Sequence, residues 1–184
     1  MVRVEDLNIT FFHIAKNAGS SIALWLENNV GGEEYHEDLR HAQPTSLEPL
    51  FDDFGWTFCV VRNPWDRMVS WYEFFRKQNR VDCSFDTFLD RSFGSERSRK
   101  YYKPLDYQKQ VSDYCDYVIR YENLIEDFKV VQEKTNCFVP LFDLNKSPRQ
   151  KTNYMDYYTD AKYVDLIRNR HAEELEHFGY EFGG

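Results

Sequence analysis

Two apolar segments that each run into a turn and a helix pattern constrain the fold of this chain most. In the first, Phe11–Ser21 (FFHIAKNAGSS), apolar residues lead into a loop of small residues that begins after Lys16. In the second, Cys59–Tyr72 (CVVRNPWDRMVSWY), the apolar run ends on Arg62, and Pro64 stands at the first position of a helix. Strand, turn and helix in succession, found twice in one chain, are typical of α/β folds with parallel strands.

Alternating strand and helix patterns continue along the rest of the chain. Strands are expected over Asn8–Ile14, Trp56–Val61 and Asp116–Tyr121. Helices are expected over Ser20–Asn29, from a Thr45–Glu48 capping box after Pro44 to about Phe54, over Trp65–Gln78 behind an Asn63 cap, over Glu122–Thr135 and over Thr159–His177. The alternation predicts an α/β fold of three layers, with a central, mostly parallel sheet flanked by helices.

The composition limits the class of protein. With 184 residues and 42% hydrophobic content, the chain is long enough to bury the core of a single domain over residues 1–184. The net charge of −8 argues against a general nucleic-acid binder, because such proteins need a basic face to displace counterions from phosphates. The four cysteines are widely spaced without a CxxC pair, which predicts reduced, structural thiols. There is no signal-peptide pattern and no apolar run near the roughly 18 residues that span a bilayer, so a soluble, cytoplasmic protein is expected.

The loop after the first strand carries groups that bind phosphate. Ala18, Gly19, Ser20 and Ser21 are small, which lets the backbone approach an anion, and the helix that follows directs its positive end at the loop. Lys16 adds a mobile positive charge. Because a strand, a turn and one lysine also occur together by chance, this loop alone does not assign phosphate binding.

The end of the second strand offers a second anion site. Arg62 presents a planar fork that matches a phosphate, and Ser70 follows in the next helix. The alternative is a surface ion pair between Arg62 and Asp66 beside a packed serine. The motif GxxxxGK[ST] is absent, and the second and third strands end on Arg62 and Tyr121 and not on an acidic residue that would hold magnesium. Metal-assisted phosphoryl transfer therefore loses support.

With these two segments, the chain resembles a known family: the sulfotransferases of the carbohydrate sulfotransferase group and the sulfotransferase family 2 domains. FFHIAKNAGSSI is similar to that family's 5′-phosphosulfate loop, usually written like HIPKTGGTS, and FCVVRNPWDRMVSWY is similar to its 3′-phosphate motif. DYVIRYENLIEDF, LNKSPRQ and HFGYEF resemble its later landmarks, so the likeness spans nearly the whole chain. Ala15 and Asn17 depart from the usual proline and threonine, within a loop that binds largely through its backbone.

The resemblance implies a P-loop-like fold and a nucleotide donor. That donor is 3′-phosphoadenosine 5′-phosphosulfate, its product is adenosine 3′,5′-bisphosphate, and no metal is required. Lys16, Asn17 and the segment Ala18–Ser21 would hold the 5′-phosphosulfate, and Arg62 and Ser70 would hold the 3′-phosphate. The late loop would close over the cofactor near its 3′-phosphate with three residues: Lys146, Ser147 and Arg149.

Sulfuryl transfer needs a base for the acceptor hydroxyl and positive charge at the leaving oxygen. Lys16 is the candidate for that charge. His41, in LRHAQPTS, is the candidate base, because members of the family carry a histidine between the two cofactor motifs and histidine accepts protons near neutral pH. His36, Glu37 or another carboxylate is the alternative base, and His13 is expected to pack against the loop or position it.

The acceptor is expected to be a hydroxyl of a glycan or of another small molecule. The basic and aromatic stretch Arg97–Lys103 (RSRKYYK) is a candidate acceptor cleft for an acidic glycan, and an exposed loop is the alternative interpretation. Two other functions stay open. One is a nucleotide or small-molecule kinase with an unusual phosphate loop, and the other is a nucleotide-binding module without catalysis.

Overall fold

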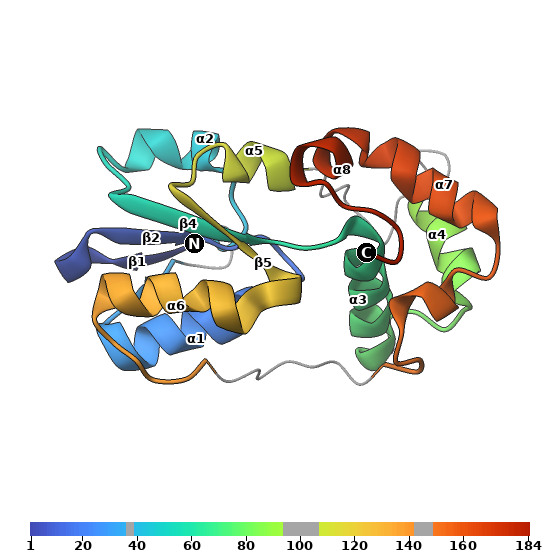
Figure 1. Cartoon of the computed structure of the whole chain (residues 1–184), viewed down its shortest axis with the longest axis horizontal. Helices are drawn as coiled ribbons and strands as arrows, with labels where there is room; N and C mark the ends of the chain where they lie inside the picture. The colour runs from blue at the N-terminus through green and yellow to red at the C-terminus, as the bar shows by residue number, and fades with distance from the viewer. Residues whose placement is uncertain (36–38, 94–106, 142–148) are drawn as a thin grey trace. The chain divides into compact units, whose positions relative to one another are not determined.

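The computed structural model of the chain describes residues 1–35, 39–93, 107–141 and 149–184, and these form two compact units (Figure 1). The sheet unit comprises Met1–Arg62 and Tyr107–Lys146. The helical unit comprises Asn63–Asp106 and Ser147–Gly184. That the whole chain acts as a single domain stays a prediction.

A five-stranded sheet in the order β3-β1-β2-β4-β5 forms the centre of the sheet unit. The strands are β1 (Val2–Val4), β2 (Ile9–Phe12), β3 (Glu33–Glu34), β4 (Trp56–Val61) and β5 (Tyr117–Arg120). Strands β2, β4 and β5 run parallel, whereas β1 pairs antiparallel with both β2 and β3. The predicted α/β fold is confirmed, and the antiparallel edge is an addition to it.

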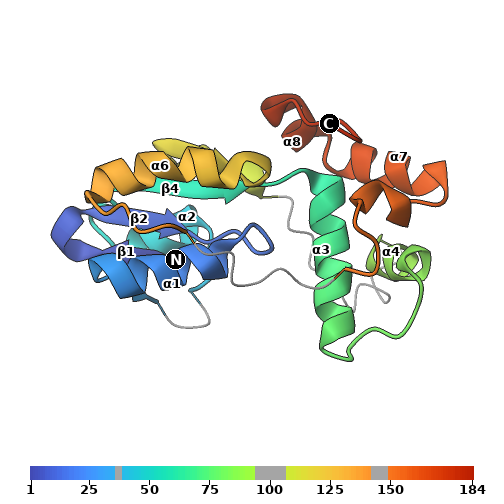
Figure 2. The same cartoon turned by 60° about the horizontal axis from the view of Figure 1, so that its bottom comes forward.

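Helices cover both faces of this sheet, as Figures 1 and 2 show. Helices α1 (Gly19–Val30) and α6 (Leu124–Thr135) lie on one face, and α2 (Pro44–Leu47) and α5 (Gln108–Ser112) lie on the other. The core under α1 and α6 joins helix residues such as Ile22, Leu26 and Phe128 to strand residues such as Phe11 and Phe58. Burying each of these side chains stabilises the fold by about 1.5–3 kcal/mol.

The helical unit packs four helices around a second apolar core. They are α3 (Pro64–Lys77), α4 (Phe85–Phe93), α7 (Ala161–Arg170) and α8 (Ala172–Phe178). The predicted start of α3 is confirmed, because the Asn63 side chain accepts a hydrogen bond from the Trp65 N–H at 3.1 Å and Pro64 occupies the first turn. Short 3-10 turns complete the two units: Glu5–Leu7, Glu48–Leu50, Tyr121–Asn123 and Tyr154–Tyr157.

The expected helix from the Thr45–Glu48 capping box to about Phe54 is wrong. Helix α2 begins one residue earlier, with Pro44 in its first turn and no side-chain cap at Gln43. It ends at Leu47 and gives way to a 3-10 turn that contains Pro49. Because proline lacks the N–H that would bond to the carbonyl oxygen four residues earlier, Pro49 prevents α2 from continuing as an α-helix.

The expected helix Thr159–His177 is interrupted. It forms as α7 and α8, with His171 between them at a φ of −110°. The His171 ring contacts the carboxylate of Glu174, with 3.1 Å between Nδ1 and Oε2, and both side chains are buried. This contact joins the residue at the break to the first turn of α8.

All four cysteines are free thiols, as predicted. The Cys115 thiol donates to the Val111 carbonyl oxygen at 3.3 Å, and contact with the Cys59 thiol together with burial raises the pKa of Cys115.

Within the described ranges, no helix is both long enough and apolar enough to cross a membrane.

Candidate functional site

The carboxyl ends of β2 and β4 bring the first two sequence motifs together. These strands are parallel neighbours, with Phe12 opposite Cys59, so the loop after β2 and the residue after β4 emerge at the same end of the sheet. The Nη1 of Arg62 donates a hydrogen bond to the carbonyl oxygen of Lys16 at 2.8 Å. Two segments that are 46 residues apart in the chain are therefore joined at one place.

Two buried amides fix the loop to the end of β4. The Asn17 Nδ2 donates to the Val60 carbonyl oxygen and to the Gln108 Oε1, both at 2.7 Å. Gln108 also accepts from the Arg62 N–H at 3.0 Å and donates to the Arg62 carbonyl oxygen at 3.1 Å. Both amide side chains are fully buried. The Asn17 side chain thus holds the loop from inside the protein.

The backbone of this loop takes a conformation that side-chain-bearing residues rarely adopt. Lys16 has a φ of 70° and Ala18 a φ of 60°, both in the left-handed region. Such conformations cost of order 1 kcal/mol each and recur at ligand-binding sites. The N–H groups of Ser21 and Ile22 donate to the Ala18 carbonyl oxygen, and the first turn of α1 begins at Gly19. Backbone donors and the positive helix end point out of this turn, an arrangement that binds anions.

Gly19 is required by its neighbour. A Cβ at this position would lie 1.9 Å from the Cδ2 of His13, so no larger residue fits without moving the imidazole. The His13 side chain is buried and packs directly under the start of α1. This is the packing and positioning role expected for His13.

The candidate base His41 contacts the same histidine. Its Nδ1 lies 2.9 Å from the carbonyl oxygen of His13, and the two rings meet edge to face with centroids 4.5 Å apart. Because a carbonyl oxygen only accepts hydrogen bonds, Nδ1 carries the proton, and Nε2 of the neutral ring keeps its lone pair. The residue is exposed, yet partial loss of water around the ring lowers the pKa of His41 below its ordinary value of 6.5. His41 is therefore a neutral proton acceptor at pH 7.

His13 is kept uncharged by its surroundings. Burial lowers its pKa to about 4, against the opposing effect of the nearby Glu34 carboxylate. The Glu34 Oε1 lies 3.7 Å from His13 Nδ1 and 2.7 Å from the Nε of Arg40, and contact with His13 lowers the pKa of Glu34. A neutral His13 adds no charge beside His41, which preserves the basicity that a base needs.

Arg62 is oriented by an aromatic ring. Its side chain is buried, and its guanidinium carbon lies 3.8 Å from the centroid of the Tyr121 ring. Stacking of this kind holds the planar fork in one orientation. Together with the bond to Lys16, it fixes a positive charge directly beneath the loop.

In the helical unit, Ser70 and Arg149 share one face of α3. Arg149 pairs with the Asp66 carboxylate, with 2.7 Å between Nη1 and Oδ1, and Ser70 follows Asp66 by one helical turn. Ser70 and Arg149 both retain partial exposure. Because Arg62 belongs to the sheet unit, joint binding of one phosphate by Arg62 and Ser70 stays a prediction.

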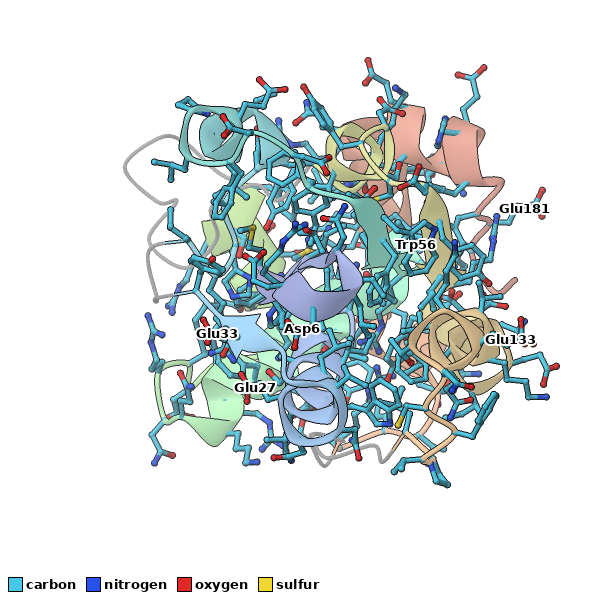
Figure 3. The ribbon with its side chains drawn as sticks, turned by 90° about the vertical axis from the view of Figure 1, so that its left-hand side faces the viewer. Asp6, Glu27, Glu33, Trp56, Glu133 and Glu181 are labelled. Atoms are coloured by element: carbon cyan, nitrogen blue, oxygen red, sulfur yellow. The ribbon has the colours of Figure 1, made fainter. Side chains whose placement is uncertain are left out.

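Some of the negative charge of the sheet unit lies away from Lys16 and Arg62. Figure 3 shows four acidic residues on the side of the sheet unit where β4 begins at Trp56: Asp6, Glu27, Glu33 and Glu133. Lys16 and Arg62 lie at the opposite, carboxyl ends of the parallel strands. A net charge of −8 is thus compatible with a local positive site.

Several residues singled out from the sequence lie outside the described part of the chain. They are the cofactor candidates Lys146 and Ser147, the alternative bases His36 and Glu37, and the acceptor stretch Arg97–Lys103. One site residue was missed, namely Gln108, whose partner Asn17 is 91 residues away. No local sequence signal marks such a long-range amide contact.

Comparisons with known proteins assign the family. The model of the family described as "Sulfotransferase domain" matches residues 47–141, a range that includes Arg62, Ser70 and Gln108 and begins after Lys16 and His41. An uncharacterized protein from Archaeoglobus fulgidus is 33% identical over 88 residues, which are 46% of this chain and 70% of that protein. The crystal structure of a sulfotransferase from Alicyclobacillus acidocaldarius aligns with 21% identity and a TM-score of 0.45, over 72% of this chain and 58% of that one. With more than half of its length matched by the family model, the chain belongs to the sulfotransferase domain family, whose general sulfuryl donor is 3′-phosphoadenosine 5′-phosphosulfate.

Proposed function

We propose that this chain transfers a sulfuryl group from 3′-phosphoadenosine 5′-phosphosulfate to the hydroxyl of an acceptor, with His41 as the base. One observation carries the proposal: the hydrogen bond from Arg62 to the Lys16 carbonyl oxygen joins the two predicted phosphate-binding segments at one end of the sheet. The family assignment supports the same reaction class.

The residues at the start of α1 fit the 5′-phosphosulfate of the donor. The left-handed turn at Lys16 and Ala18 presents backbone donors, and the absence of a Cβ at Gly19 lets the His13 imidazole pack beneath this turn. The hydroxyls of Ser20 and Ser21 are further donors. In the helical unit, the Ser70 hydroxyl and the Arg149 guanidinium suit a phosphate, which is the group that distinguishes this donor at its 3′ position. When bound, the donor supplies an activated sulfuryl group.

His41 would accept the proton of the acceptor hydroxyl at Nε2. The bond from its Nδ1 to the His13 carbonyl oxygen holds the ring in the tautomer that leaves Nε2 free to do so. Its lowered pKa keeps the ring unprotonated at neutral pH. A base in this state removes a proton without first losing one of its own.

Lys16 would stabilise the negative charge that develops on the leaving oxygen. Its backbone is fixed through Arg62, while its side chain is half-buried and long enough to follow the charge. Positive charge placed before the reaction begins costs no reorganisation when the bond breaks.

The acceptor that we propose is a carbohydrate hydroxyl. The support is the resemblance of the cofactor motifs to carbohydrate sulfotransferases. Screening sugars, small alcohols and tyrosine peptides with labelled donor tests this part separately. Sulfate transfer to alcohols or peptides but to no sugar would contradict it.

Calorimetry with adenosine 3′,5′-bisphosphate tests the donor site. We expect binding without magnesium, much weaker binding of adenosine monophosphate, and a loss of affinity of about 100-fold in Arg62→Ala, since a charge-assisted contact is worth about 1.5–3 kcal/mol. Arg168→Ala, which removes an exposed arginine of α7, is the matched control and should bind as the wild type does.

Equal binding of adenosine monophosphate and adenosine 3′,5′-bisphosphate would refute the two-ended site. Magnesium-dependent phosphate transfer from ATP would support the kinase alternative, and nucleotide binding without transfer to any acceptor would support the non-catalytic one.

A further inference from the structure

A buried carboxylate in α3 has no part in the reaction described above. The Glu73 side chain is fully buried, three residues beyond Ser70 in the same helix. Its Oε2 accepts from the Arg76 Nε at 2.8 Å, and its Oε1 accepts from the Gln150 backbone N–H at 3.1 Å and from the Tyr157 hydroxyl. A buried charge with this many donors is held in place, and it holds its donors in place in turn.

Tyr157 adds the next residue of the segment, Lys151, to the hydrogen bonds around Glu73. Its side chain is buried. Its hydroxyl oxygen accepts a hydrogen bond from the Lys151 backbone N–H at 3.0 Å, and the same hydroxyl donates a hydrogen bond to the Glu73 carboxylate. Burial and the Glu73 carboxylate raise the pKa of Tyr157 to about 12, so the hydroxyl stays a donor throughout the physiological range. Glu73 and Tyr157 therefore bind the N–H groups of two consecutive residues, Gln150 and Lys151.

The residue just before this pair is Arg149. Its guanidinium contacts Asp66 at 2.7 Å, so the segment Arg149–Lys151 is attached to α3 directly at Arg149 and Gln150 and, through Tyr157, at Lys151. Asp66, Ser70 and Glu73 are spaced by four and three residues, which places them on one face of α3. The segment accordingly lies along the face that carries Ser70.

We propose that Glu73 and Tyr157 are positioning residues for the 3′-phosphate. By holding the backbone of Gln150 and Lys151, they keep the Arg149 guanidinium on the face of α3 that carries Ser70, and this sets the preference for a 3′-phosphorylated nucleotide. The inference rests on the proposed function, because it assumes that the donor is bound there. An arginine whose position is fixed before binding loses less conformational entropy when it contacts phosphate, which is why the anchoring affects affinity.

The variant Tyr157→Phe tests the inference in the full-length protein. It removes one hydroxyl and keeps the ring, so Glu73 loses a donor and the Lys151 N–H loses its acceptor. We expect the Kd for adenosine 3′,5′-bisphosphate to rise about tenfold, as for the loss of one buried hydrogen bond, with no change for adenosine monophosphate. The kcat at saturating donor should stay near that of the wild type.

Tyr158→Phe is the matched control. It removes a tyrosine hydroxyl of the same unit that donates to the Trp65 carbonyl oxygen at 2.9 Å. We expect it to keep the wild-type preference for the 3′-phosphorylated nucleotide. A double-mutant cycle completes the test, because Tyr157→Phe should have no further effect on binding in an Arg149→Ala background if it acts through Arg149.

The outcomes separate this inference from the proposed function. If the wild type shows no preference for adenosine 3′,5′-bisphosphate over adenosine monophosphate, the proposed function fails and the inference fails with it. If the wild type shows the preference and Tyr157→Phe retains it, even with a lower melting temperature, only the inference is overturned. Additive effects of Tyr157→Phe and Arg149→Ala would overturn it as well.

Discussion

The two units hold their candidate anion sites by different means. In the sheet unit, buried uncharged amides fix the loop at Lys16 together with the bond from Arg62, because Asn17 and Gln108 bond to each other and to the backbone of Val60 and Arg62. The histidine that packs beneath this loop is also uncharged, since burial lowers the pKa of His13 to about 4. Acid is therefore the condition that should disturb this site.

In the helical unit, charged groups fix the segment that begins at Arg149. The Glu73 carboxylate anchors the backbone, and the ion pair between Asp66 and Arg149 holds the guanidinium. Partly exposed ion pairs are weakened by salt, whereas buried hydrogen bonds between neutral groups are not. The difference suggests a division of labour, in which His41 in the sheet unit governs turnover and Arg149 in the helical unit governs the choice of donor.

The largest expected effect is on turnover, from His41→Ala. Loss of a general base lowers kcat by about 10²–10⁴-fold, while the Kd for adenosine 3′,5′-bisphosphate should stay near the wild-type value. The measurement is labelled sulfate transfer at saturating donor, and His177→Ala, at an exposed histidine of α8, is the control. If His41→Ala retains the wild-type kcat, the base lies elsewhere and the proposed division of labour loses its strongest support.

The next effect is acid destabilisation through His13. The unfolded chain takes up a proton near the ordinary pKa of 6.5, whereas the folded protein resists protonation until about pH 4. Stability is therefore unaffected above about pH 6.5 and falls as the pH decreases towards 4, by about 3 kcal/mol from this residue. Denaturant unfolding from pH 7 to pH 4 should show a loss in the wild type that His13→Phe, which lacks a titrating ring, largely avoids. Equal losses in both proteins would contradict this reading of the site.

A smaller effect is expected at the contact between Gly19 and His13. Gly19→Ala places a methyl group 1.9 Å from the imidazole and should cost about 1–3 kcal/mol of stability, as overpacked sites do. It should also weaken binding of adenosine 3′,5′-bisphosphate, because the loop cannot keep its shape. Shortening the neighbour relieves the clash, so the double variant Gly19→Ala/His13→Ala should be more stable than the sum of the two single changes predicts. Strict additivity of the unfolding free energies would show that the two residues do not collide.

The sequence predicted the parts of the site that depend on local patterns. Lys16 was expected in the loop after the first strand and Arg62 at the end of the second, and both are found there, since apolar strands followed by turns define those places without tertiary information. Asn63 and Pro64 likewise predicted the start of α3. In contrast, Gln108 bonds to Asn17, 91 residues away in the chain, and Tyr157 bonds to Glu73, 84 residues away. No local sequence pattern predicts such pairs.

The fold shows the same limit. Strand β1 has three residues and β3 has two, too few for an alternating pattern to stand out, so the antiparallel edge of the sheet became visible only in the structure. The break at His171 likewise falls within a continuous helical pattern, where His171 makes a buried contact with Glu174. Regular, long elements are predictable because many residues contribute to each, whereas single contacts are not.

The smallest effect, and the one that compares the two units most directly, is a salt dependence. Asp66→Asn removes the ion pair with Arg149, which is about one-fifth exposed, and should lower the free energy of unfolding by about 1 kcal/mol at low ionic strength. That loss should shrink by 0.5 M salt, where the Debye length is only about 4–5 Å. Gln108→Ala removes neutral, fully buried hydrogen bonds, so its cost should be the same at both salt concentrations. If the two variants respond equally to salt, the sheet unit and the helical unit are not held by different kinds of interaction, and the division between turnover and donor choice would have to rest on kinetics alone.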